Sequence, residues 1–456
     1  MLTLREEMSG AQEIDAKPPR PKHFIKMTCR QFRQVPLSCK CLCGVQCSPM
    51  KILFVHQNFP GQYLHLARYL GAQPGNEIVF ITQRKDATLP GVRNIVYKPH
   101  RAVTQNQHHY LVNTEAGLLN AQAVARVALD LKQSGFTPDV MLGHNGWGEP
   151  WYLKDVYPNT PLIGYFEFFY RFLGADVGFD PDEPQIFDTA PRIRTKNLGN
   201  LLGLDAADMG QTPTEWQRSL YPAAFQSRLH VTHEGVDTEL VKPDSSACLS
   251  LPESGIDLTL DDEVVTYVAR NLEPYRGFPN FMRSLPAILV RRPNAHVLIV
   301  GGDEVSYGHR LPEGQTHKQR MLAELGSSLD MKRVHFLGKV PYPVFLKVLQ
   351  VSRAHVYLTF PFVLSWSMLE AMSAGCLVIG SKTAPVEEVI RDGQNGLLVD
   401  FFSVAAISEQ VVDALAAGRD GYADIRQNAR RTIVEKYDLK TICLPAQLQL
   451  LKTANL

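Results

Sequence analysis

The chain has 456 residues, of which 45% are hydrophobic and 20% charged, so it is long enough for two domains with separate cores and has a globular composition. Its formal net charge of +1 provides no global field that would favour nucleic acid. The N-terminus lacks the basic-then-apolar pattern of a signal peptide, and the longest apolar stretch divides into short elements, so we expect no transmembrane helix.

Residues 1–49 are predicted to be a disordered leader, because they have no hydrophobic period and contain a basic, proline-rich run at 17–22. Five of the eight cysteines lie in this leader, with spacings that differ from those of a zinc finger. We therefore favour disorder over a zinc site. A first strand begins directly after Met50, so we expect either that Met50 is the natural start or that the leader is a targeting tail.

Residues 50–243 are predicted to form a first domain, in which strands alternate with helices as in a parallel sheet. The expected strands are 51–55, 78–82, 138–144, 161–166 and 229–233, and the expected helices are 63–70, 111–134 and 198–209. A capping box is expected at Thr212–Glu215. The turn after the first strand contains only Gly61, where a nicotinamide-binding fingerprint needs three glycines, so that class of site is disfavoured. Gly61 would let the backbone approach a ligand closely.

Polar side chains follow two of these strands, where open α/β sheets place their ligands. His144 and Asn145 end one strand, and Glu167, Tyr170 and Arg171 follow the next. His144 is a candidate proton acceptor, although a single histidine at a strand end is more often structural.

Residues 244–263 are polar and are predicted to be an irregular linker. Residues 264–436 are predicted to form a second α/β domain. Its expected strands are 264–269, 296–300, 333–337, 356–360, 376–380 and 397–399, with helices at 278–290, 341–350, 405–417 and 425–437 and one more after Pro361. Gly301 and Gly338 each follow a strand and are candidate ligand-binding positions.

The stretch Val356–Ser381 is predicted to be one strand–helix–strand unit, and Glu370 is its only charged residue. Burial of one carboxylate among apolar residues is costly unless the carboxylate is hydrogen-bonded. Glu370 is therefore interpreted as an acceptor for the hydroxyl groups of a ligand, and a surface-facing glutamate is the alternative.

The sequence here reads LEAMSAGCLVIGS, followed by APVEEVI and NGLLV, and it resembles the donor-binding motif of glycosyltransferase family 4. The similarity runs from about Met50 to the C-terminus. The resemblance implies an α/β GT-B fold, in which two Rossmann-like parallel-sheet domains face each other across a cleft. It implies that the first domain binds the acceptor, that the second binds a nucleotide sugar, and that residues 437–456 cross back to the first domain.

Two arginines are candidates for stabilising the diphosphate that leaves during sugar transfer. Arg270 and Arg276 lie on one loop after a strand, and guanidinium groups can hold phosphate oxygens bidentately. They match an arginine and a lysine of the family, whereas solvated surface arginines are the alternative. No Asp-x-Asp follows a strand, so we expect no metal cofactor. Together with His144 and Glu167, these arginines make up the predicted catalytic set.

Phe362 departs from the family pattern, in which a glutamate lies eight positions before the one matched by Glu370. That carboxylate commonly contacts the donor sugar in the family. Ser365 and Ser367, with the backbone amides there, could still meet the phosphate. The departure keeps a non-catalytic nucleotide-binding or glycan-binding protein open as an alternative.

The predicted function is that of a retaining, metal-independent hexosyltransferase. It would use a UDP- or GDP-sugar and a glycan or lipid-linked acceptor, as in polysaccharide biosynthesis, and no nucleic acid. An epimerase or hydrolase that acts on a nucleotide sugar is a further alternative. We expect a cytoplasmic location, with peripheral contact at the inner face of a membrane left open.

Overall fold

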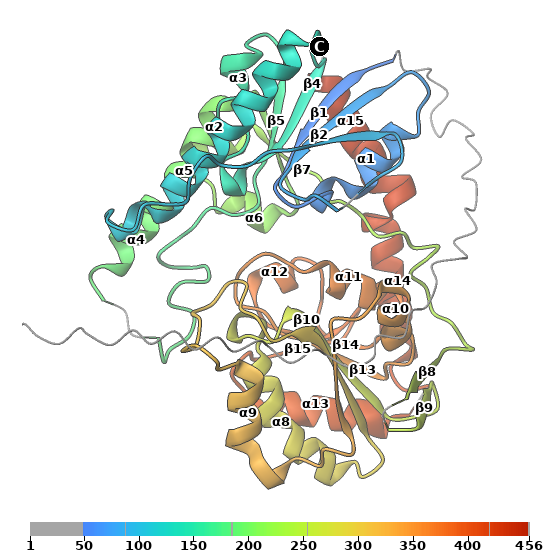
Figure 1. The fold of residues 1–456 in the computed structure, drawn as a ribbon. Coiled ribbons are helices and arrows are strands. Elements are labelled where there is room, and N and C mark those ends of the chain that lie inside the picture. Colours follow the sequence, from blue (N-terminus) through green and yellow to red (C-terminus); the bar gives the residue numbers. More distant parts are fainter. Residues whose placement is uncertain (1–48, 87, 184–185, 253, 419, 455–456) are drawn as a thin grey trace, which may run out of the picture. The chain divides into compact units, whose positions relative to one another are not determined.

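Two parallel β-sheets, each covered by helices on both faces, organise the computed structural model (Figure 1). The structure describes residues 49–86, 88–183, 186–252, 254–418 and 420–454, so the predictions for residues 1–48 lie outside it. Residues 49–456 form one compact unit. We call the part built on the first sheet the N-lobe and the part built on the second sheet the C-lobe. This architecture confirms the predicted α/β fold class.

The N-lobe sheet has seven strands in the order β3-β2-β1-β4-β5-β6-β7. Its strands are β1 Lys51–Val55, β2 Glu77–Thr82, β3 Val92–Val96, β4 Val140–His144, β5 Leu162–Tyr165, β6 Met209–Thr212 and β7 Leu229–Val231. Its helices are α1 Leu64–Gly71, α2 Val112–Gln133, α3 Leu153–Val156, α4 Thr189–Lys196, α5 Leu198–Ala206, α6 Glu215–Ser219 and α7 Ala223–Gln226. Alternate residues of β1 serve different cores: Leu53 packs on the side of α2, and Phe54 packs on the side of α1.

The C-lobe sheet has six strands in the order β12-β11-β10-β13-β14-β15. Its strands are β10 Val264–Asn271, β11 His296–Gly302, β12 Val334–Gly338, β13 Ala354–Tyr357, β14 Val378–Ser381 and β15 Leu397–Val399. Its helices are α8 Phe278–Arg291, α9 His317–Leu325, α10 Tyr342–Gln350, α11 Trp366–Ser373, α12 Ala384–Glu387, α13 Val404–Ala416 and α14 Ala423–Tyr437. The predicted strand–helix–strand unit is confirmed as β13, α11 and β14.

The prediction that residues 244–263 form an irregular linker is wrong for part of the segment. It contains an antiparallel hairpin of β8, Cys248–Leu251, and β9, Ile256–Thr259. Leu249 and Leu258 are buried there and belong to a core that also includes Val348 of α10. The polar composition of the segment concealed this hairpin, because only alternate residues face the C-lobe.

The predicted capping box at Thr212–Glu215 is wrong. Thr212 lies within β6, and Thr214 caps α6 by accepting a hydrogen bond from the Gln217 amide at 3.1 Å. The Gln217 side chain accepts from the Thr214 hydroxyl at 3.0 Å, so the contact is an N-cap without the reciprocal backbone bond of a capping box.

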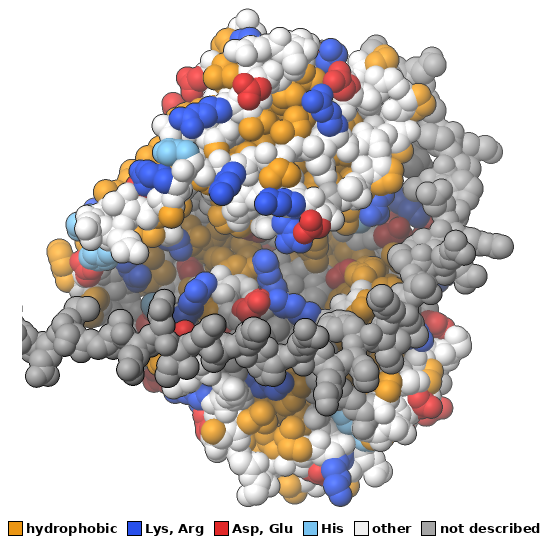
Figure 2. Space-filling model, viewed as in Figure 1, with side chains coloured by type: hydrophobic (Ala, Val, Ile, Leu, Met, Phe, Trp, Pro, Cys, Tyr) orange, Lys and Arg blue, Asp and Glu red, His pale blue; other side chains and the backbone are white. Residues whose placement is uncertain are grey.

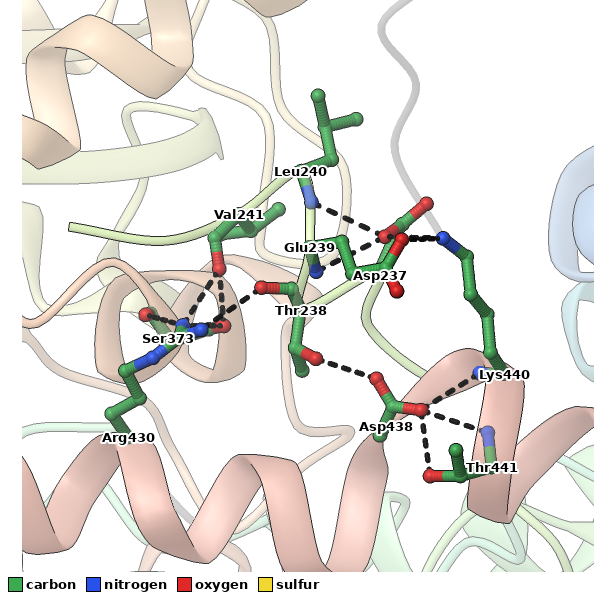
Figure 3. A network of polar contacts seen from close by, with 10 residues as sticks. All are labelled: Asp237, Thr238, Glu239, Leu240, Val241, Ser373, Arg430, Asp438, Lys440 and Thr441. Carbon is green, nitrogen blue, oxygen red and sulfur yellow. Dashed lines mark hydrogen bonds and ion pairs between the residues drawn. The ribbon is translucent and has the colours of Figure 1, made fainter. Parts of the chain in front are cut away.

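The chain passes between the lobes at two places that hydrogen-bond to each other (Figure 3). Thr238 donates its hydroxyl to the Asp438 carboxylate at 2.6 Å, and Arg430 donates to the carbonyl oxygens of Thr238, Val241 and Ser373 at 2.6–3.1 Å. After this crossing, α15, Leu444–Ala454, packs on α1, and its Leu450 and Leu451 join the N-lobe core.

Candidate functional site

A pocket of about 410 Å³ lies at the carboxyl ends of three adjacent C-lobe strands. Arg270 is near the end of β10, Gly301 is near the end of β11, and Lys339 directly follows β12. The walls between them are largely apolar and are contributed by Ala269, Val300, Val340, Tyr342 and Phe345. Figure 2 shows Lys and Arg side chains gathered where this face of the molecule is hollowed. Apolar walls with cationic groups suit a flat, anionic ligand.

Glu370 lies one turn into α11 and is connected to this pocket through Tyr342. The Tyr342 hydroxyl donates to Glu370 Oε1 at 2.7 Å, and the ring of Tyr342 lines the pocket. Burial raises the pKa of Glu370 to about 7, and the hydrogen bond from Tyr342 acts in the opposite direction. Glu370 is thus a half-buried carboxyl group with one oxygen already bonded.

The two predicted serines close the start of α11. Ser365 is its N-cap, its hydroxyl lies 2.9 Å from that of Ser367, and its amide donates to the Tyr357 hydroxyl at 2.8 Å. The candidate glycines have local roles. A Cβ on Gly301 would lie 2.7 Å from a Leu272 methyl carbon, and Gly338 has a φ of +65°.

The structure does not bring Arg270 and Arg276 together on one open surface. Arg270 lines the pocket, whereas Arg276 is buried and donates to Thr359 Oγ1 at 2.7 Å and to the Val363 carbonyl at 2.9 Å. These two bonds fix the segment that leads from β13 to α11. Arg276 therefore shapes the approach to α11 from within the protein.

Phe362 occupies the position of the missing family glutamate and is buried among aromatic rings. Its ring centroid lies 4.6 Å from that of Phe168, 4.9 Å from that of Tyr307 and 5.6 Å from that of Tyr275. Phe168 belongs to the N-lobe, so this cluster joins the two lobes. At this position the chain therefore has an apolar contact between the lobes instead of a carboxylate.

Glu167 follows β5 in the N-lobe and is the partly exposed member of a buried polar group. Gln62 donates to Glu167 Oε1 at 3.1 Å and accepts from His56 at 2.7 Å. Burial, reinforced by the nearby charge of Glu234, raises the pKa of Glu167 to about 7, while Arg276 and Arg270 act in the opposite direction. The two arginines of the C-lobe are therefore close enough to Glu167 for their charges to lower its pKa.

His144 lies behind Glu167 and is fully buried. The Gly146 amide donates to His144 Nδ1 at 3.1 Å, so the proton of the neutral ring is on Nε2, which lies 3.8 Å from Glu167 Oε2. Burial lowers the pKa of His144 well below its usual value, so the ring is neutral. His144 therefore lies beside the candidate site, next to Glu167.

The other N-lobe candidates have internal partners. Asn145 accepts a hydrogen bond from the Trp151 indole at 2.9 Å, Tyr170 stacks under Lys196, and Arg171 donates to the Leu220 carbonyl at 2.6 Å. A Cβ on Gly61 would lie 2.5 Å from His56 Nε2, so the close approach that this glycine permits is to a side chain of the protein itself.

Two glutamates that are not among the predicted site residues form hydrogen bonds between the lobes. Glu234 accepts hydrogen bonds from the hydroxyl of Tyr165 at 2.6 Å and from the indole of Trp366, the first residue of α11, at 3.0 Å. Glu388 of the C-lobe accepts from the first two backbone amides of α6 at 2.7–2.9 Å. The first contact holds the start of α11 against the N-lobe, and the second holds the end of α12 against α6.

Two family models match the chain in consecutive segments. Residues 74–241 match the glycosyl transferase family 4 group, and residues 255–432 match glycosyl transferases group 1. The chain belongs to glycosyltransferase family 4. This family membership confirms the resemblance seen in the sequence and makes the protein a glycosyltransferase.

Characterised relatives of this family 4 glycosyltransferase are distant. A D-inositol 3-phosphate glycosyltransferase of Corynebacterium glutamicum is 25% identical over 71% of this chain and 73% of its own length. A GDP-mannose-dependent phosphatidylinositol monomannoside mannosyltransferase of Mycolicibacterium smegmatis is 28% identical over 50% of this chain and 57% of its own length.

Solved structures confirm the GT-B fold. Anabaena HepE in complex with UDP and glucose has a TM-score of 0.61 at 17% identity and covers 88% of this chain and 99% of its own. Sucrose-phosphate synthase from Thermosynechococcus elongatus has a TM-score of 0.66 at 14% identity and covers 89% of this chain and 98% of its own. At these identities the likeness shows the fold alone.

Among the residues of the glycosyltransferase that the structure describes, no helix combines the length and apolar character needed to cross a membrane. In the same ranges, His, Cys, Asp and Glu side chains form no group of three that could hold a metal ion.

Proposed function

We propose that this family 4 glycosyltransferase moves a sugar from a nucleotide-sugar donor to a glycan or lipid-linked acceptor, with retention of anomeric configuration. The observation that carries the proposal is the pocket that combines Arg270, apolar walls and, through Tyr342, the carboxyl group of Glu370. HepE, a structural neighbour, is in complex with UDP and glucose, and one relative is named as GDP-mannose-dependent. A UDP- or GDP-sugar fits both the pocket and these likenesses.

In this proposal the donor lies along the carboxyl ends of the C-lobe strands. Glu370 accepts hydrogen bonds from the ribose hydroxyls, since its second oxygen has no bond to Tyr342. Arg270 and the start of α11 bind the diphosphate, because guanidinium groups and helix N-termini both favour anions. Arg276 contributes by fixing the segment before α11.

The leaving diphosphate gains negative charge as the bond to the sugar breaks, and fixed cations can stabilise that charge. We assign this role to Arg270 and the α11 terminus, and we propose that no metal cofactor takes part. In a front-face reaction the acceptor oxygen forms its bond on the side from which the phosphate departs, and the departing phosphate oxygen takes the acceptor proton.

The acceptor side of the reaction is proposed to be the N-lobe surface around Glu167. Glu167 is partly exposed and accepts a hydrogen bond from Gln62, and the charges of both C-lobe arginines lower its pKa. It would accept a hydrogen bond from the acceptor hydroxyl and so orient its oxygen toward the donor. His144, which is buried behind it, would act as a positioning residue.

The test is to incubate the protein with UDP- and GDP-hexoses, with and without glycan and lipid-linked acceptors, and to assign the anomeric configuration of any product by NMR. Transfer with retention, unchanged by EDTA, is the expected result. Inversion would contradict the retaining assignment, and loss of activity in EDTA that magnesium restores would contradict the assignment of charge stabilisation to Arg270.

A second candidate, binding without transfer, is favoured by one observation, the burial of Phe362 where the family carries a carboxylate. Donor binding that shifts the melting temperature, with no product from any donor and acceptor, would support it. Release of free sugar or of an epimer from the donor alone would instead indicate a hydrolase or an epimerase.

A further inference from the structure

We infer that Lys339 recognises the nucleobase of the donor and favours a base with a carbonyl oxygen facing it, namely uracil, thymine or guanine, over the amino bases cytosine and adenine. The inference rests on the proposed nucleotide-sugar function and adds a residue that selects the base. Lys339 is not among the site residues predicted from the sequence.

Strand order places Lys339 at the end of the pocket that is far from the diphosphate. The order is β12-β11-β10-β13, α11 follows β13, and Lys339 follows β12. Three strand spacings of roughly 4.8 Å therefore separate Lys339 from the start of α11, about 14 Å in all. A diphosphate held by Arg270 and α11 leaves its nucleoside to extend outward, past Glu370 and Tyr342, toward Lys339.

Lys339 is free to exchange its present partner for a ligand. Its ammonium group lies 2.6 Å from the carboxylate of Glu304, and both side chains are more than half exposed, at 58% and 74%. An ion pair as exposed as this contributes little and is readily replaced. The ammonium group can therefore turn to a carbonyl oxygen in the pocket at small cost.

Gly302 brings Lys339 beside an acceptor that lacks a partner. A Cβ at Gly302 would lie 2.4 Å from Lys339 Cε and 2.6 Å from Asn271 Oδ1, so only a glycine leaves room for both. Within the described chain, Asn271 Oδ1 is buried and has no hydrogen-bond partner. A buried acceptor without a partner is costly, so a ligand N–H that reached it as Lys339 moved would gain a bond.

These two groups form a pair of opposite hydrogen-bonding character. An ammonium group only donates, and an amide oxygen only accepts. Uracil, thymine and guanine present a carbonyl oxygen next to a ring N–H, which matches the pair. Adenine and cytosine carry an amino group where the carbonyl would be, and two donors would then face each other. Lys339, which lines the pocket, and Asn271, which lies behind Gly302, would together select the carbonyl bases.

The experiment measures dissociation constants of UDP, GDP, CDP and ADP by calorimetry for the unaltered protein, Lys339→Met, Lys339→Arg and the control Glu304→Gln. The unaltered protein is expected to bind UDP or GDP at least 10-fold more tightly than CDP and ADP. Lys339→Met should reduce this preference below 3-fold, mainly by weakening the carbonyl bases. Lys339→Arg and Glu304→Gln should retain the preference, and all melting temperatures should stay close to that of the unaltered protein.

A uniform loss of affinity for all four nucleotides in Lys339→Met would overturn the inference, because Lys339 would then act on the phosphates. An unchanged preference in that variant would overturn it as well. If the unaltered protein bound none of the four nucleotides, the donor proposal itself would fail, and this inference with it. The two failures are therefore distinguishable in one set of measurements.

Discussion

The polar groups at the carboxyl ends of the two sheets differ in burial and in charge. In the C-lobe, Arg270 and Lys339 line a pocket and have charge available to a ligand. In the N-lobe, His56, His144 and Glu234 are almost completely buried, and the histidines are neutral because burial lowers their pKa values. The two lobes thus differ: the C-lobe presents charged side chains at its pocket, whereas these polar groups of the N-lobe are fixed in its interior.

The largest expected effect comes from removing the charge in the pocket. Arg270→Ala should lower kcat/KM for donor turnover about 100-fold, or roughly 3 kcal/mol, because a charge-assisted phosphate contact is lost. The melting temperature should change little, since Arg270 lines a pocket. Unaltered kinetics in this variant would contradict the proposal that the charge in the C-lobe pocket acts on the donor.

Arg276→Met should act mainly on stability, because Arg276 is buried and bonded internally. Loss of its bonds leaves two buried acceptors without donors, so the free energy of unfolding should fall by about 2–3 kcal/mol. Denaturant titration of this variant beside Arg270→Ala measures the contrast. A variant as stable as the unaltered protein would show that Arg276 is not the internal support described above.

Donor affinity should rise with pH through the neutral range. The pKa of Glu370 is about 7, and only its ionised form is a full acceptor for ribose hydroxyls. Between pH 6 and 8, KM for the donor should fall about 10-fold, and Glu370→Gln should abolish this dependence. Tyr342→Phe should move the midpoint to higher pH, since the bond from Tyr342 lowers the pKa of Glu370. A pH-independent KM in the unaltered protein would contradict the role of Glu370.

The smallest effect is expected from Glu167 on stability. Burial raises its pKa from 4.5 to about 7, so the folded protein holds this proton more tightly than the unfolded chain does. The resulting stabilisation is complete below pH 4.5 and is lost as the pH rises to 7. Glu167→Gln removes that loss, so its melting temperature should exceed that of the unaltered protein by a few degrees at pH 8 and not at pH 4.5. Parallel pH profiles for the two proteins would contradict the assignment.

The regular elements were predictable where apolar residues are continuous and buried on both faces. β1, β13 and β14 are such strands, and the ends of each lie within three residues of the expected range. The hairpin β8–β9 was missed because it is buried on one face only. The boundary between α5 and β6 was also missed, since Met209–Thr212 carries no strand-forming run.

The candidate site was predictable as a set of residue types and less so as an arrangement. The sequence indicated Arg270 and Glu370, which lie in or beside one pocket. It could not show that Arg276 bonds to Thr359 and Val363, because those bonds depend on how three segments pack. Tyr342 and Lys339 were missed for a related reason: they follow β12, and only the strand order brings that strand's end to the pocket.

The return of α15 to the first lobe makes the two halves unequal as independent pieces. Leu444, Leu450 and Leu451 join a core that also contains residues of α1 and of the strands β1, β2, β4 and β5. A chain cut after Tyr437 would therefore expose apolar surface on the N-lobe, although the cut removes no residue of that lobe's own sheet. Any exchange of lobes between related proteins, by evolution or by engineering, must carry this last helix along with the first half of the chain rather than with the second.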